Sequence, residues 1–139
     1  MRRYSHYIIP AVFSIIVSIL TYLKRSEIMA LSNAISLKPT LFTTSGTLFG
    51  LALTSYGIFF GLVPLLNKEI KESTTLKSVS KYFYVCLWLL LVFVITSLMF
   101  MFYDSTYILI INAFVFAYIV AMFFYIIAGM RSLFKIISN

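Results

Sequence analysis

The sequence predicts an all-α, polytopic membrane protein with four transmembrane helices, and two observations support this fold class. Of its 139 residues, 62% are hydrophobic and 11% are charged, whereas a soluble domain has about 45–50% apolar and about 25% charged residues. The apolar residues also form four uncharged runs, each close to the roughly 20 residues that cross a bilayer as a helix. Barrel strands would instead alternate apolar and polar residues over about ten positions. We therefore expect a single transmembrane domain over residues 1–139.

The first predicted span covers residues 4–23 and has Pro10 in its first turn, where the missing N–H is tolerated. Arg2 and Arg3 precede this run, so it could also be a signal peptide. It is followed by charged residues without a convincing small-residue cleavage site, and no soluble mature domain follows. A helix that is retained in the mature protein is therefore the better interpretation.

Residues 24–45 form the longest polar stretch of the chain. Within it, Ile28, Leu31 and Ile35 recur at helical spacing, and Pro39 ends the pattern. This spacing fits a short helix lying on the membrane surface. An ordered loop fits the same stretch equally well.

The other predicted spans cover residues 46–66, 83–102 and 107–129. A charged connector, residues 67–82, separates the second span from the third, and it could extend a helix. A brief turn, residues 103–106, separates the last two spans. Each span is expected to be helical because lipid offers no hydrogen-bond partner to a bare backbone N–H or C=O.

The basic residues predict the orientation of the four spans. With four spans, both termini and the connector 67–82 lie on one side of the membrane. By the positive-inside rule, the side richer in Lys and Arg faces the cytoplasm. The connector side carries Arg2, Arg3, Lys68, Lys71, Lys77, Lys81, Arg131 and Lys135, and the other side carries Lys24, Arg25 and Lys38. We therefore expect both termini to be cytoplasmic.

Tyrosine and tryptophan residues support these span limits. Such side chains are enriched where a helix passes through the membrane–water interface. Those near predicted span ends are Tyr82, Tyr84, Trp88, Tyr103 and Tyr107.

The strongest local pattern is a face of small residues in the second span. Two of its intervals, Gly46–Gly50 and Gly57–Gly61, are GxxxG motifs. Small residues let helix backbones approach closely in lipid, so we expect this face to meet another helix. Packing within one chain, a subunit interface and a pore-lining face are all compatible with it. The face consists of Gly46, Gly50, Thr54, Gly57 and Gly61.

Polar side chains inside the other spans define a candidate polar path. Ser14, Ser18 and Thr21 share one face of the first span, and Asn112 lies near the outer end of the fourth. Hydroxyls in helices usually bond to their own carbonyls, and facing a water-filled path is the alternative. Ala113, Ala117 and Ala121, spaced by four, indicate helix packing.

The residue types that are missing narrow the function classes. No Asp, Glu, Lys, Arg or His lies in the central part of any predicted span, which argues against proton-coupled and many ion-coupled carriers. A channel lined by hydroxyls, carbonyls or apolar gates is still compatible. We expect no enzyme, cofactor, metal site or small-molecule substrate. The net charge of +7 is explained by topology and lipid headgroups, so direct nucleic-acid binding is not expected.

The connector 67–82 is the largest predicted cytoplasmic surface. Lys68, Lys71, Lys77 and Lys81 could dock a soluble partner there. A solvated linker whose lysines set the topology is the alternative.

Several short pieces along the chain match a known kind of membrane protein: Ile8-Ile9-Pro10, residues 14–23, Thr40-Leu41, Gly46-Thr47, Gly61 and Lys71-Glu72. With these pieces, the layout of the chain resembles RexB, the membrane component of the Rex phage-exclusion system. The resemblance covers most of the length, and the last two spans agree in length more than in identity. It implies a bacterial inner-membrane channel that depolarises the cell after a cytoplasmic partner senses infection, and it supplies no site residues. The architecture is also similar to KwaA, the four-span subunit of the Kiwa defence system.

These observations lead to one main hypothesis and two alternatives. The main hypothesis is a homo-oligomeric channel or membrane-perturbation sensor in antiphage defence, acting in the bilayer with a cytoplasmic partner. One alternative is a non-conducting anchor or scaffold for a cytoplasmic effector. The other is a small carrier or an immunity protein, which the lack of buried charge disfavours.

Overall fold

The computed structural model describes residues 5–34, 37–66, 68–103 and 105–137, and every secondary-structure element in these ranges is helical. Arg2, Arg3, Ile35 and Asp104, which entered the sequence analysis, lie outside the described residues. The elements in chain order are α1 (Ser5–Leu23), α2 (Arg25–Ala34), α3 (Leu37–Leu62), the 3₁₀ turn η1 (Val63–Leu65), α4 (Lys68–Glu72), α5 (Thr74–Phe102) and α6 (Thr106–Ile137).

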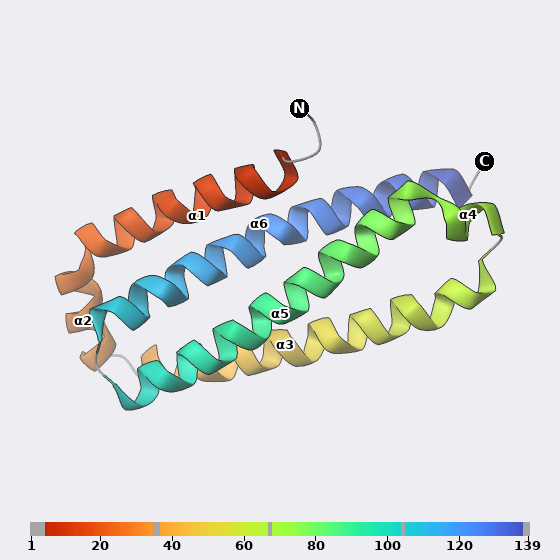
Figure 1. Ribbon diagram of the computed structural model, residues 1–139. Coiled ribbons are helices and arrows are strands. Elements are labelled where there is room, and N and C mark those ends of the chain that lie inside the picture. Colours follow the sequence, from red (N-terminus) through yellow and green to blue (C-terminus); the bar gives the residue numbers. More distant parts are fainter. Residues whose placement is uncertain (1–4, 35–36, 67, 104, 138–139) are drawn as a thin grey trace.

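The four long helices lie alongside one another in the order α1, α6, α5, α3 (Figure 1). Helix α6 packs on both α1 and α5, and α5 packs on α6 and α3. Helix α2 and the turn between α5 and α6 lie at one end of the bundle, which we call the α2 end. Helix α4 and the last turns of α6 lie at the opposite end, which we call the α4 end. The chain order therefore differs from the spatial order, and the first long helix packs on the last.

The buried side chains of the bundle follow the seam between α5 and α6. Leu90, Phe93 and Phe100 of α5 are at most 2% exposed, as are Ile119 and Met122 of α6. Leu90, Phe93 and Ile119 belong to one hydrophobic cluster, which also includes Ala52 of α3.

The outward faces of the helices are also apolar. Leu23 is 68% exposed, Leu51 61% and Phe124 69%, and these residues belong to three different helices. Contiguous apolar surface of this extent is rare on soluble monomers, whereas lipid tails solvate such side chains without a penalty. Fold and surface together are those of an α-helical membrane protein.

Three helical segments are long and apolar enough to cross a membrane: Leu37–Leu65, Thr74–Phe102 and Thr106–Lys135. The apolar part of α1, Tyr7–Leu23, is shorter. The prediction of an all-helical membrane protein is therefore confirmed. The count of four spans and their orientation stay predictions.

Helices α3, α5 and α6 are longer than the predicted spans, whereas α1 ends at the predicted Leu23. Because α1 already includes Ser5, Pro10 lies inside this helix and not in its first turn as predicted. Helix α3 begins at Leu37, and Pro39 lies in its first turn, where no intrahelical N–H is needed. The polar stretch before it contains α2, so residues 25–34 form a helix and not the ordered loop that the sequence also allowed. Helix α5 begins at Thr74 because the Ser73 side chain caps it by accepting a hydrogen bond from the Leu76 N–H at 3.2 Å.

Candidate functional site

The small residues of α3 form a stripe on its exposed side, and the structure leaves this stripe uncovered. A Cβ atom added at any of its four glycines would meet no neighbouring atom within 4 Å. The Thr54 hydroxyl donates to the Gly50 carbonyl at 2.9 Å and so stays within the helix. Helix α3 packs on α5 through a different side, where Ala52 is 7% exposed. Among the described residues, packing within one chain is therefore not the role of the stripe, which we call the glycine stripe (Gly46, Gly50, Thr54, Gly57 and Gly61).

The glycine that does pack within the chain is Gly129 of α6. A Cβ atom there would lie 2.5 Å from Cγ2 of Val79 on α5. Val79 is 1% exposed, so its side chain has little room to move. Sequence reasoning missed this contact, although Gly129 lies eight residues after Ala121 and so continues the row of small residues, interrupted by Tyr125, that begins at Ala113.

The hydroxyls of α1 bond to their own helix. Ser14 donates to the Pro10 carbonyl at 2.7 Å, Ser18 to the Ser14 carbonyl at 2.8 Å, and Thr21 to the Val17 carbonyl at 2.9 Å. This is the back-bonding that hydroxyls in helices usually adopt. Each of these hydroxyl protons has an acceptor within the helix, so none of them requires a water-filled path.

Asn112 lies at the contact between α5 and α6 and is 2% exposed. Its Oδ1 accepts from the Thr96 hydroxyl and from the Ser97 hydroxyl, the latter at 3.5 Å. Thr96 also lies 3.0 Å from the Val92 carbonyl, and its single proton serves one acceptor at a time. The Asn112 Nδ2 has no hydrogen-bond partner among the described residues. A buried donor left in this state costs about 1–3 kcal/mol.

The structure brings two residues of the candidate polar path together. Thr21 and Asn112 line the same cavity, which has a volume of about 300 Å³ and lies between the helices near the α2 end. Ser14 and Ser18 do not line it. Of the four candidate path residues, Ser14 and Ser18 therefore lie away from the cavity, whereas Thr21 and Asn112 both line it.

The connector lysines also divide into two pairs. The Lys71 Nζ donates to the Pro64 carbonyl at 2.9 Å and so ties α4 to η1. The Lys81 Nζ lies 5.6 Å from the centroid of the Tyr7 ring, a cation–π contact between α5 and α1. Lys68 and Lys77 have exposed side chains at the α4 end. The first pair stabilises the fold, and the second is open to a partner.

No protein family, curated protein or solved structure matches this chain significantly. The class that fold and surface define is an α-helical membrane protein.

Proposed function

We propose that this chain is a homo-oligomeric membrane component of bacterial antiphage defence, acting as a channel or membrane-perturbation sensor with a cytoplasmic partner and doing no catalysis. The observation that carries the assembly is the glycine stripe, which is exposed and has no side chain of the described residues over its glycines. Stripes of this kind let two helices approach closely in lipid. The defence role rests on the resemblance to RexB.

Conduction, where it occurs, takes place between copies of the chain. The core shared by α5 and α6 contains large side chains such as Leu90, Phe93 and Ile119, which are at most 2% exposed. The α1 hydroxyls are bonded to their own carbonyls. A path between subunits could instead be lined by the backbone of the glycine stripe and by Thr54, because neutral pores use carbonyl and hydroxyl oxygens.

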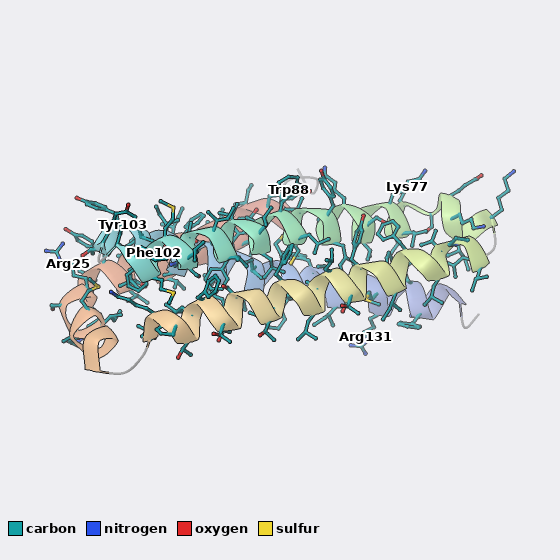
Figure 2. The ribbon with its side chains drawn as sticks, turned by 90° about the horizontal axis from the view of Figure 1, so that it is seen from below. Arg25, Lys77, Trp88, Phe102, Tyr103 and Arg131 are labelled. Atoms are coloured by element: carbon teal, nitrogen blue, oxygen red, sulfur yellow. The ribbon has the colours of Figure 1, made fainter. Side chains whose placement is uncertain are left out.

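The distribution of basic residues supports a cytoplasmic α4 end. Arg25 lies at the α2 end, near Phe102 and Tyr103, whereas Lys77 and Arg131 lie in the other half (Figure 2). The positive-inside rule then favours an inner-membrane protein with both termini in the cytoplasm. Lys68 and Lys77 would present their ammonium groups to the soluble partner.

The test of assembly uses Gly50→Leu and Gly57→Leu. A Cβ atom added at either position meets no neighbouring atom within 4 Å, and Leu is a better helix former than Gly by roughly 0.5–1 kcal/mol. The single chain should therefore fold, while oligomers should dissociate because the bulky side chains keep the helices apart. Ala128→Leu is the matched control, since it makes a similar change at an exposed position of α6 outside the stripe.

Oligomer size in lipid nanodiscs and ion flux from liposomes provide the two measurements. Both stripe variants should lose oligomer and flux, and the control should keep both. Wild-type oligomer size in Gly50→Leu and Gly57→Leu would refute assembly through this face. A stable wild-type oligomer that conducts nothing would favour the second candidate, a non-conducting anchor for an effector bound at Lys68 and Lys77.

A further inference from the structure

The α2-end cavity is the space of about 300 Å³ that Thr21, Thr44 and Asn112 line together. Its wall is built by α1, α2, α3, α5 and α6, so distant parts of the sequence converge on it. Its volume falls at the lower end of the range of small-molecule sites, which is about 300–1,000 Å³. The cavity is therefore large enough for a small ligand.

The polar groups of the cavity require a ligand that both accepts and donates hydrogen bonds. The Asn112 side chain lines the cavity, and its Nδ2 is a donor without a partner among the described residues. Less than 1 Å² of this nitrogen is exposed, so a ligand oxygen reaches it once the amide turns toward the cavity. The Thr21 hydroxyl gives its proton to the Val17 carbonyl and keeps lone pairs that can accept. Thr44 adds a second hydroxyl to the wall.

The rest of the wall is apolar and uncharged. Phe93 and Phe116 contribute aromatic rings to it, and the described residues that line the cavity include no Asp, Glu, Lys or Arg. A charged ligand would lose its hydration there without a compensating partner. The wall thus suits a neutral head joined to an aliphatic segment.

The depth of Asn112 agrees with a ligand from the lipid phase. Asn112 lies six residues after Thr106, the first residue of α6, which corresponds to about 9 Å along the helix axis. Tyr103 and Tyr107, 65% and 77% exposed, lie at this end of α5 and α6, where tyrosines typically contact the headgroup region. The donor is therefore placed near the level of the lipid ester groups.

We propose that the α2-end cavity binds a neutral amphiphile whose head carries ester carbonyl and hydroxyl oxygens, with a carbonyl oxygen accepting from the Asn112 Nδ2. Either a membrane lipid or a small free amphiphile can supply this chemistry. The site does not depend on the proposed defence role or on assembly through the glycine stripe. It also adds a small-molecule ligand that the sequence analysis did not expect.

The experiment observes the Asn112 side chain directly. Protein labelled with ¹⁵N-asparagine is placed in nanodiscs of a diether phosphatidylcholine, and 1-monooctanoylglycerol is titrated in. The Asn112 amide signal, assigned by its loss in Asn112→Leu, should shift saturably. Undecane, which has no oxygen, should not shift the Asn112 signal.

Two variants test the site without removing the reporter. Ala113→Leu fills the cavity that Ala113 lines, so it should raise the apparent dissociation constant at least about tenfold. Thr21→Val removes an acceptor at constant shape and should weaken binding severalfold. Ala128→Leu, at a lipid-facing position outside the cavity, should bind like the wild type.

Nanodiscs of diester phosphatidylcholine show whether the ligand is a membrane lipid or a small free amphiphile. If the lipid itself fills the cavity, the Asn112 signal should already differ from that in diether lipid, and 1-monooctanoylglycerol should shift it little. If a free amphiphile is the ligand, both lipids should give the same signal before titration. An Asn112 signal that responds to neither lipid nor amphiphile, or that responds equally in Ala113→Leu, would overturn the proposal.

Discussion

Gly129→Ala tests whether close packing between α6 and α5 depends on the absence of a side chain. The added Cβ would lie 2.5 Å from the Val79 Cγ2, whereas carbon atoms in contact are about 3.5–4.0 Å apart. One of the two groups must therefore move by about 1 Å or more. Val79 is β-branched, has essentially one rotamer in a helix, and is 1% exposed, so the two helices must separate locally.

The expected change in unfolding free energy is the sum of two opposing effects. Overpacking a tight contact destabilises by about 1–3 kcal/mol. Replacing Gly by Ala within a helix stabilises by about 1 kcal/mol. We expect Gly129→Ala to lower the free energy of unfolding by roughly 0–2 kcal/mol. Gly50→Ala is the matched control, because its Cβ enters open space and only the helix-propensity gain applies.

A double-mutant cycle separates the contact from the propensity effect. Val79→Ala removes the atom that the new Cβ would touch, so the double variant should be more stable than the two single changes predict. The coupling energy should be about 1–3 kcal/mol, measured by reversible unfolding in mixed micelles at a protein concentration where the chain is monomeric. Additivity within about 0.5 kcal/mol would refute the reasoning.

Two further predictions concern the α4 end and the topology. Lys71→Met removes the hydrogen bond to the Pro64 carbonyl, so amide exchange in η1 and α4 should accelerate by the equivalent of about 0.5–1.5 kcal/mol, and unchanged exchange would show that the contact is not stabilising. In a Cys86→Ala background, a membrane-impermeant maleimide should label Lys24→Cys in intact cells and Lys77→Cys only after permeabilisation. The reverse pattern would invert the orientation, and labelling of both from one side would show that α3 does not cross the membrane.

The helices were predictable from the sequence, as were the ends of α1 at Leu23 and of α5 at Phe102, whereas the starts of α3 and α5 were not. Uncharged runs become helices because a chain in lipid must satisfy its own backbone groups. This rule sets the minimum length of a helix and does not say where it ends in water. Helices α3 and α5 therefore continue over polar residues, from Leu37 and from Thr74, that a hydropathy profile assigns to connectors.

The sequence could not predict in the same way which helix covers each face of α3 and α6. Helical spacing shows that Gly50 and Gly57 share a face, but the covering neighbour depends on the spatial order of the helices. That order places α5 on a different side of α3 and leaves the stripe open, while Gly129 packs against Val79. Thr21 and Asn112 meet at one cavity for the same reason, because packing between distant segments brings them together.

The packing of α1 on α6 has a consequence for biogenesis. Helix α1 is synthesised before α6, so it has to remain without this partner while the chain between them is translated. Its sequence fits such a delay, since it has no charged residue between Tyr7 and Leu23 and the hydroxyls of Ser14, Ser18 and Thr21 are bonded to its own carbonyls. In the two-stage view of membrane protein folding, helices first form alone and then associate. The backbone and hydroxyl groups of α1 are satisfied within the helix, and its docking on α6 completes the bundle only after α6 has been translated.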